Sequence, residues 1–100
     1  MDWKVIFSAQ AGHDLGQVVA FLAQKNPEAA ARRGHALVDR ALSLAQFPRR
    51  GVEVKARPGV RRIVHRPWFV IYYRVNEARG VIEIARFWDA RQDPRGLRLG

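Results

Sequence analysis

The chain has 100 residues, contains no cysteine and carries a formal net charge of +9 at pH 7. This length, with nearly half of the residues apolar, predicts one domain over residues 1–100 with one modest core. The absence of cysteine excludes disulfides and thiolate zinc sites, and no apolar run approaches the roughly 20 residues that a membrane-spanning helix needs.

The first segment predicts a strand followed by a helix. Apolar and mixed positions alternate over residues 3–8, as in a strand with one apolar face, and Ser8 is a preferred helix N-cap residue. Apolar residues then recur at the spacing of one helical face, which predicts a helix over residues 9–25: Leu15, Val18, Val19 and Leu22. Asp14 is interpreted as a first-turn charge that complements the helix dipole.

A second helix is predicted over residues 27–46. Asn26 is a preferred N-cap residue and Pro27 a preferred first helical residue, so the two helices share a very short joint. Several small residues on its predicted buried side would let the helices approach closely: Ala30, Gly34 and Ala41. The same side carries larger apolar residues: Leu37, Val38, Leu42 and Leu44 or Ala45.

The second half of the sequence is rich in aromatic and β-branched residues and predicts three antiparallel strands: residues 60–65, 68–75 and 81–87. A basic loop or irregular strand at residues 49–58 precedes them. Two turns separate them: Arg66-Pro67 and residues 76–80. The predicted fold class is therefore α+β in the order β-α-α-β-β-β, with residues 88–100 forming a mostly extended basic tail.

The central strand predicts which side of the sheet faces the helices. Its apolar positions share one face: Phe69, Ile71, Tyr73 and Val75. The preferred register pairs apolar with apolar and one positive with one negative charge: Val75 with Ile82, Tyr73 with Ile84 and Arg74 with Glu83. The opposite face would then be an open basic and aromatic surface: Trp68, Tyr72, Arg74, Glu83, Ala85 and Phe87.

Positive charge is concentrated in the sheet half. Residues 1–48 contain five Lys/Arg and four Asp/Glu, whereas residues 49–100 contain thirteen and five. Most of the cations are arginines, whose planar fork suits bidentate contacts with carboxylate and phosphate. Such a surface attracts nucleic acid, an acidic protein or an anionic membrane; an arginine-rich genome with a solvated surface is the alternative. The N-terminal residues show no signal-peptide pattern, so we expect a cytoplasmic protein that does not act at a membrane.

No metal or cofactor site is predicted, because His13, His35 and His65 lie on different elements without partners at ligand spacing. Five arginines from neighbouring strands and the strand-to-tail junction are candidates for binding phosphates: Arg61, Arg62, Arg74, Arg86 and Arg91. Four of them, all except Arg62, are the candidates for a role in RNA cleavage, where they would stabilise the developing charge. A partner-binding surface is predicted around the open face: Arg62, Trp68, Tyr72, Arg74, Phe87 and Trp88. The aromatics among them could stack on bases, but we favour a groove that takes an amphipathic protein segment.

Several short motifs follow one another along the chain: Asp14-Leu15, Asn26-Pro27-Glu28-Ala29-Ala30, Phe47-Pro48, Gly51, Val60-Arg61, Ile71-Tyr72-Tyr73-Arg74-Val75, Val81-Ile82-Glu83-Ile84 and Arg91. In this order they resemble the RelE/ParE superfamily of toxins from type II toxin–antitoxin pairs, and the resemblance covers most of the chain. It implies a growth-inhibiting, plasmid-stabilising toxin with a helix pair on a curved sheet. It also implies a cognate antitoxin that wraps the toxin in a hetero-oligomer.

The two branches of this superfamily differ in what they do. RelE-like members cleave mRNA, usually on the ribosome, whereas ParE-like members inhibit DNA gyrase without known catalysis. Arg61 and Arg91 match basic positions of the nuclease branch, but Val70 stands where that branch has arginine, and the tail has no tyrosine. Arginine is a poor general base. We therefore favour a non-catalytic, ParE-like gyrase inhibitor; the alternatives are a RelE-like mRNA endonuclease and a non-toxic basic binding module.

Overall fold

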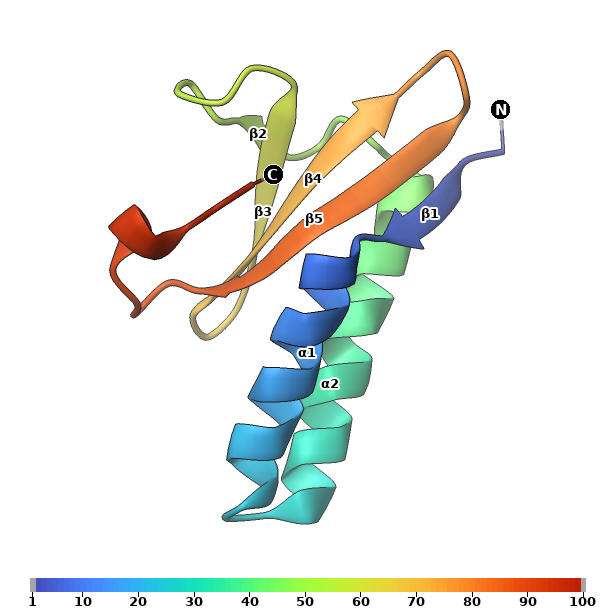
Figure 1. Ribbon diagram of the computed structural model, residues 1–100. Helices are drawn as coiled ribbons and strands as arrows, with labels where there is room; N and C mark the ends of the chain where they lie inside the picture. Colours follow the sequence, from blue (N-terminus) through green and yellow to red (C-terminus); the bar gives the residue numbers. More distant parts are fainter. Residues whose placement is uncertain (1, 100) are drawn as a thin grey trace.

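The computed structural model describes residues 2–99 as a five-stranded sheet with a helix pair on one face and the C-terminal segment on the other (Figure 1). The strands lie in the order β1-β5-β4-β3-β2. β1 (Lys4–Phe7) is parallel to β5 (Val81–Asp89), and the other neighbours are antiparallel: β2 (Val52–Glu53), β3 (Val60–His65) and β4 (Phe69–Asn76). The predicted α+β class is confirmed: β1 is the predicted opening strand, β3, β4 and β5 are the three predicted antiparallel strands, and β2 is an additional short strand.

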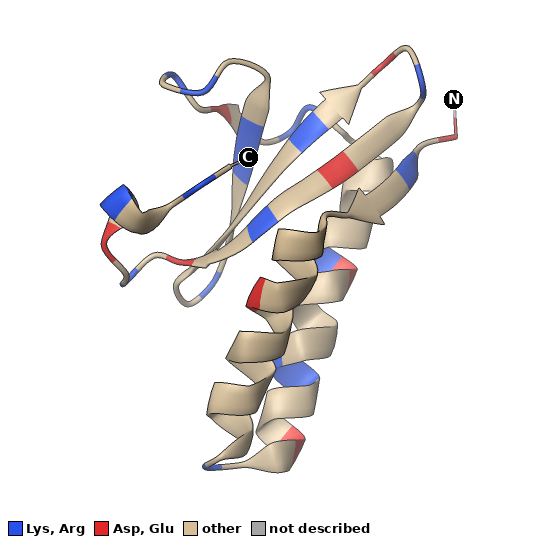
Figure 2. Ribbon diagram, in the orientation of Figure 1, with Lys and Arg blue, Asp and Glu red and all other residues tan. Residues whose placement is uncertain are grey.

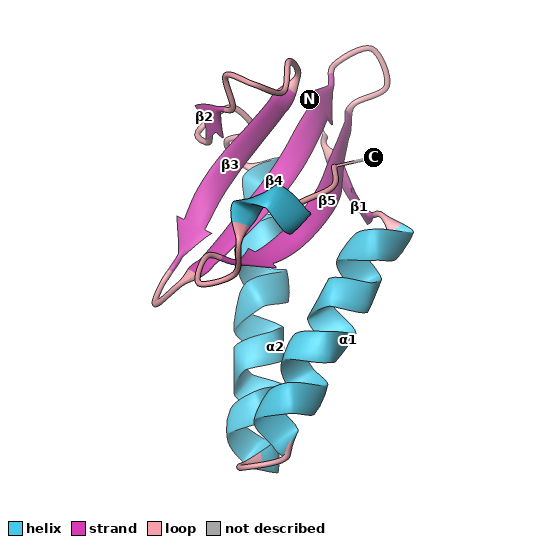
Figure 3. Ribbon diagram, turned by 60° about the vertical axis from the view of Figure 1, so that its left-hand side comes forward, coloured by secondary structure: helices cyan, strands magenta, loops and turns pink. Residues whose placement is uncertain are grey.

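The helices α1 (Ala9–Ala23) and α2 (Pro27–Leu42) form the predicted hairpin, and a 3₁₀ turn, η1 (Ser43–Ala45), follows α2. The hairpin contacts the sheet at the beginning of α1 and the end of α2, and its joint projects beyond the sheet (Figures 1 and 3). Leu42, which the periodicity placed on the buried side, is exposed. The last turn tightens into η1 and turns Leu44 inward instead, where it is fully buried.

The local signals at the helix ends and at the helix contact are confirmed. The side chains of Ser8 and Asn26 each accept a hydrogen bond from a backbone amide in the first turn of the following helix. Gly34 is buried where the helices meet, and a Cβ atom at this position would lie 2.8 Å from Val19 Cγ2. The hairpin is therefore packed too closely for a larger side chain at residue 34 without movement of α1.

Apolar side chains form two clusters, one on each face of the sheet. The helix-side cluster contains most of the large buried residues: Leu37, Leu44, Ile63, Phe69, Ile71, Tyr73, Ile82, Ile84 and Phe87. The tail-side cluster forms where the C-terminal segment crosses the sheet: Val60, Tyr72, Ala85, Trp88, Leu97 and Leu99. Both faces of the sheet are therefore partly covered by the chain itself.

The predicted register between β4 and β5 is confirmed for three pairs: Val75 with Ile82, Arg74 with Glu83 and Tyr73 with Ile84. A β-bulge follows, because Tyr72 pairs with Arg86 and leaves Ala85 as an additional residue in β5. A bulge reverses the alternation of side chains between the two faces. The prediction that Phe87 lies on the face without helices is therefore wrong, since Phe87 packs in the helix-side cluster.

The C-terminal segment folds back instead of extending into solvent. β5 continues to Asp89, and a second 3₁₀ turn, η2 (Pro94–Gly96), leads the chain back across the sheet (Figure 1). The predicted extended tail is therefore wrong, because Leu97 and Leu99 are buried on the sheet. The predicted open face is wrong for Tyr72 and Ala85, which are buried in the tail-side cluster, and Trp88 of the predicted partner-binding surface is buried there as well.

Tyr73 holds the loop that leads into β2. The Gly51 amide donates a hydrogen bond to the Tyr73 hydroxyl at 2.9 Å, and this hydroxyl donates to the Pro48 carbonyl at 2.8 Å. Burial raises the pKa of Tyr73 above its usual value. A Cβ atom at residue 51 would collide with the same hydroxyl, so the loop requires glycine at this position.

We expect Tyr73→Phe to lower the free energy of unfolding by about 1–3 kcal/mol, because the buried Gly51 amide loses its acceptor. Urea denaturation followed by tryptophan fluorescence measures the change. Tyr72→Phe is the matched control, since the Tyr72 hydroxyl makes no hydrogen bond to residues 2–99, and it should change stability by less than about 0.5 kcal/mol. Equal losses in both variants would contradict the role given to the Tyr73 hydroxyl.

Candidate functional site

A groove of about 330 Å³ lies between α1 and the end of the sheet where β4 begins and β5 ends. Five residues predicted from the sequence to bind a partner or an anion line it: Trp68, Arg86, Phe87, Trp88 and Arg91. The helices contribute residues that were not predicted as site residues: Asp14, Gln17, Val18, Phe21, Leu22 and Arg33. We refer to these two sets of residues together as the α1–β5 groove.

Asp14 and Arg86 form a buried ion pair within the α1–β5 groove. Arg86 Nε and Nη2 donate to the two carboxylate oxygens of Asp14 at 2.7 and 2.9 Å. The side chains of Arg86 and Asp14 are only 10% and 6% exposed. The carboxylate also accepts hydrogen bonds from the Phe87 amide and from Gln10 Nε2, both at 3.1 Å. Asp14 is therefore the hydrogen-bonding partner of β5 at the part of its edge that β1 does not reach.

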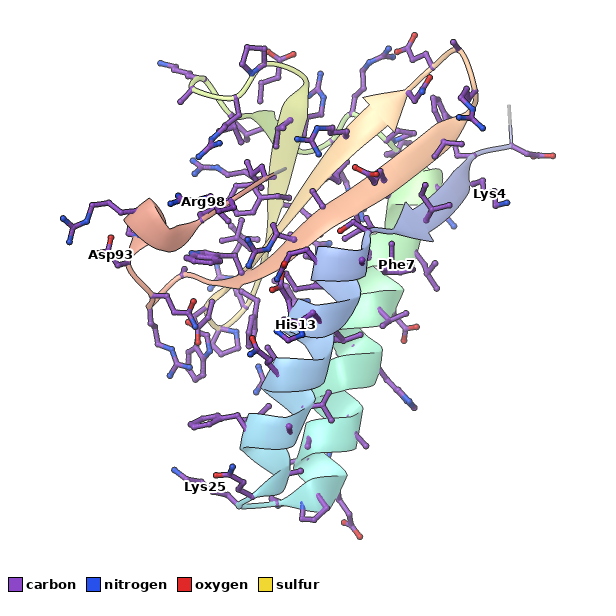
Figure 4. All side chains as sticks on the ribbon, viewed as in Figure 1. Lys4, Phe7, His13, Lys25, Asp93 and Arg98 are labelled. Atoms are coloured by element: carbon purple, nitrogen blue, oxygen red, sulfur yellow. The ribbon has the colours of Figure 1, made fainter. Side chains whose placement is uncertain are left out.

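Arg74 and Arg86, which the sequence predicts as anion-binding residues, hold the C-terminal segment. Arg86 Nη1 donates to the Arg98 carbonyl at 2.7 Å, and Arg74 Nη2 donates to the Leu99 carbonyl at 2.6 Å. Arg98 follows η2 on the segment that returns to the sheet (Figure 4). Arg74 also contacts Glu83 at 3.3 Å, which is the predicted cross-strand charge pair. Both guanidinium groups therefore have structural partners within the chain.

Arg61 and Arg91 lie at different places in the structure. Arg61 Nη1 donates to the carbonyls of Gly51 and Arg49 at 2.8 and 3.2 Å, so it supports the loop before β2. Arg91 pairs with Asp89 at 2.7 Å, and its guanidinium carbon lies 4.0 Å from the centre of the Trp68 ring. The hydrogen bond from the Arg91 side chain lowers the pKa of Asp89.

The four arginines predicted for RNA cleavage do not gather at one site. Successive pairs share a hollow on the surface: Arg61 with Arg74, Arg74 with Arg86, and Arg86 with Arg91. Basic residues are spread over the sheet, the loops and the C-terminal segment and are fewer on the helices (Figure 2). Their roles as phosphate ligands stay a prediction, but the arrangement is a row of arginines and not a cluster.

The rim of the α1–β5 groove combines exposed aromatic surface with positive charge. Trp68 packs against the helix-side cluster, so its predicted position on the opposite face is wrong. Its indole nitrogen is buried and has no hydrogen-bond partner among residues 2–99. Phe21 of α1 is 59% exposed, and Arg33 and Arg91 flank the apolar walls. Such a surface suits a partner segment that carries apolar residues next to carboxylates.

Another predicted partner-binding residue lies outside the α1–β5 groove. Arg62, predicted to bind a partner, is exposed on β3, away from the groove.

Within residues 2–99, no three His, Asp or Glu side chains are grouped as a metal site requires. None of the described helices is long and apolar enough to cross a membrane.

The helical half of the groove was missed by the sequence analysis, although one signal points to it. Asp14 lies on the same stripe of α1 as Ala11 and Val18, which face the sheet. A carboxylate on a buried stripe requires a cation or several donors. The position of Asp14 on this stripe therefore predicts a buried cationic partner, but the sequence does not say which arginine that partner is.

A family model described as the ParE toxin of type II toxin–antitoxin system, parDE, matches residues 5–94, which include the whole α1–β5 groove. A chain of the chromosomal ParDE system from P. aeruginosa has a TM-score of 0.73 and 23% identity, covering 87% of this chain and 95% of that chain. A chain of the RelBE2 toxin–antitoxin complex from Mycobacterium tuberculosis has a TM-score of 0.65 and 22% identity, covering 89% and 99%. At these identities, the structural similarity shows a shared fold. The curated proteins contain no significant match.

We expect Asp14→Ala to lower the free energy of unfolding by about 3–5 kcal/mol, because Arg86 would stay buried without its partner. Thermal and urea denaturation measure the loss. Asp39→Ala is the matched control, because Asp39 is an exposed aspartate on α2, and it should change stability by less than about 0.5 kcal/mol. If Asp14→Ala is as stable as Asp39→Ala, the buried pair does not hold α1 against β5.

Proposed function

Because the chain belongs to the family of ParE toxins of type II toxin–antitoxin systems, we propose that it inhibits bacterial growth by binding DNA gyrase. The observation that supports this target is the match of the ParE model to residues 5–94, which is nearly the whole chain. A cognate antitoxin neutralises the toxin by forming a hetero-oligomer with it. The proposed target implies action in the cytoplasm.

The antitoxin is proposed to bind in the α1–β5 groove. Phe21 and Trp68 offer apolar surface on opposite walls, and Arg33 and Arg91 add positive charge at the rim. An amphipathic segment with acidic residues would bury the apolar surface and pair with the arginines. Phe21 is the best candidate for an anchoring contact, because a large exposed aromatic at the edge of a groove gains most from burial.

The contacts of the arginines support the gyrase proposal over an mRNA endonuclease. RNA cleavage requires a group that accepts a proton from the attacking 2′-hydroxyl and cations that stabilise the developing charge. Arg61, Arg74 and Arg86 are each engaged by carbonyl or carboxylate groups of the chain itself. The C-terminal segment also covers part of the face on which an RNA substrate would lie.

Inducible expression without the antitoxin separates the two targets. We expect growth arrest accompanied by DNA-damage signalling and loss of negative supercoiling, because gyrase is the proposed target. Plasmid topoisomers and mapped RNA ends are measured in the same cells. Codon-positioned mRNA cleavage with normal supercoiling would contradict the proposal and support the endonuclease. Normal growth with confirmed expression would favour a non-toxic binding module.

We expect Phe21→Ser to weaken the complex with the protein encoded by the adjacent short reading frame at least about tenfold, because the groove loses its exposed aromatic contact. Isothermal titration calorimetry measures the affinity. Phe47→Ser is the matched control, since Phe47 is 66% exposed and lies outside the α1–β5 groove. A complex that tolerates Phe21→Ser as well as it tolerates Phe47→Ser would move the antitoxin site elsewhere.

A further inference from the structure

We propose that the outer edge of β3 is a second peptide-binding site, where an extended acidic segment of a partner protein adds a strand to the sheet. We call this surface the β3-edge site, and its residues are Arg40, Arg50, Val52, Arg62, Val64 and Arg66. It is separate from the α1–β5 groove and does not depend on the identity of the toxin's target. The proposal rests on three properties of this edge: open backbone, exposed valines and positive charge that no carboxylate of residues 2–99 balances.

The backbone of β3 is only partly covered by its neighbour. β2 pairs with Arg61 and Arg62 alone, and the chain before β2 turns away at Gly51, whose amide bonds to Tyr73. Beyond this point β3 is the outermost strand of the described sheet (Figure 3). Uncovered strand edges present unpaired amides and carbonyls to an incoming strand.

Val64 offers a backbone donor and acceptor on this edge. Its carbonyl accepts a hydrogen bond from Arg40 Nη2 at 3.1 Å, so this carbonyl points outward from the sheet. The amide and carbonyl of one residue in an antiparallel strand point to the same side, so the Val64 amide also points outward. An incoming strand can pair with both groups once one of its carboxylates binds the Arg40 guanidinium in place of the Val64 carbonyl.

Exposed apolar side chains lie beside this backbone. Val52 is 64% exposed and Val64 is 56% exposed, and Val70 of β4 lies directly opposite Val64. The C-terminal segment covers the other end of this face, around Val60, and the tail-side cluster also contacts Val70. Val52 and Val64 stay exposed. A strand with small apolar residues at alternate positions would bury them, because its side chains alternate between faces.

The charge of the β3-edge site is not balanced within the described chain. Every acidic residue of the sheet half pairs with an arginine outside this site: Glu53 with Arg61, Glu77 with Arg49, Glu83 with Arg74, Asp89 with Arg91 and Asp93 with Arg95. Arg40 and Arg50 donate only to uncharged oxygens. Burial, together with the charges of Arg40 and Arg33, lowers the pKa of His65 at the end of β3. Carboxylates on an incoming strand would complement this charge.

These features favour a peptide over a nucleic acid. Proteins that bind single-stranded nucleic acid use aromatic side chains on which bases stack. No aromatic residue lines the hollow that contains the β3-edge site. The open backbone and the valines, in contrast, are what an added strand uses.

A labelled peptide of alternating glutamate and valine tests the proposal with the full chain. We expect saturable binding in fluorescence anisotropy and slower hydrogen exchange at the Val64 amide. Arg62→Glu combined with Arg66→Glu should lower the affinity at least about tenfold through charge reversal. The matched control, Lys55→Glu combined with Arg79→Glu, makes the same charge change outside the site. It should alter the affinity for the peptide by less than about twofold. Circular dichroism confirms that each variant is folded.

The same peptide methylated on alternate backbone amides keeps its charge but cannot pair as a strand, so it should bind at least about tenfold more weakly. Equal binding of the methylated peptide would overturn strand addition. Tighter binding of a single-stranded oligonucleotide, lost on charge reversal at Arg62 and Arg66, would assign the site to nucleic acid and also overturn the proposal. Neither result changes the Phe21→Ser test, which reports on the α1–β5 groove alone.

Discussion

The buried ion pair between Asp14 and Arg86 is the interaction on which the rest of the structure depends. It joins α1 to β5 through two hydrogen bonds, and the same carboxylate accepts the Phe87 amide at the edge of β5. The remaining guanidinium nitrogen of Arg86 holds the C-terminal segment through the Arg98 carbonyl. Because a buried charge without a partner is strongly destabilising, the helix, the strand and the tail must meet in this one arrangement.

The β-bulge at Ala85 makes this arrangement possible. Without the additional residue, strand alternation would direct Arg86 toward the helices and Phe87 toward the opposite face. With it, Arg86 pairs with Tyr72 across the strands and reaches both Asp14 and the tail, while Phe87 enters the helix-side cluster. The apolar residues at the end of β5 are thereby divided between two faces, and Trp88 provides the surface on which Leu97 and Leu99 pack.

The arginines of this ParE-family protein fall into two groups. Several arginines stabilise the fold: Arg61 holds the loop before β2, and Arg74 and Arg86 hold the tail. Each side-chain carboxylate of the sheet half forms an ion pair with an arginine, so the positive charge without a carboxylate partner among residues 2–99 lies at other places. One is Arg33 at the rim of the α1–β5 groove, and another is the edge of β3. Net charge alone therefore overstates how much positive surface is available for a partner.

The sequence by itself determined the two helices, four of the five strands, both helix caps and the register of three β4–β5 pairs, because these depend on neighbouring residues or on matching cross-strand pairs. It also identified four residues of β5 and the following turn that line the groove: Arg86, Phe87, Trp88 and Arg91. Only the tertiary structure decided which face Phe87 occupies, since a bulge leaves no mark in the pattern of β5. Only the tertiary structure joined Asp14 to Arg86 and placed the tail on the sheet, because these contacts link segments that are distant along the chain and form only when the whole chain packs.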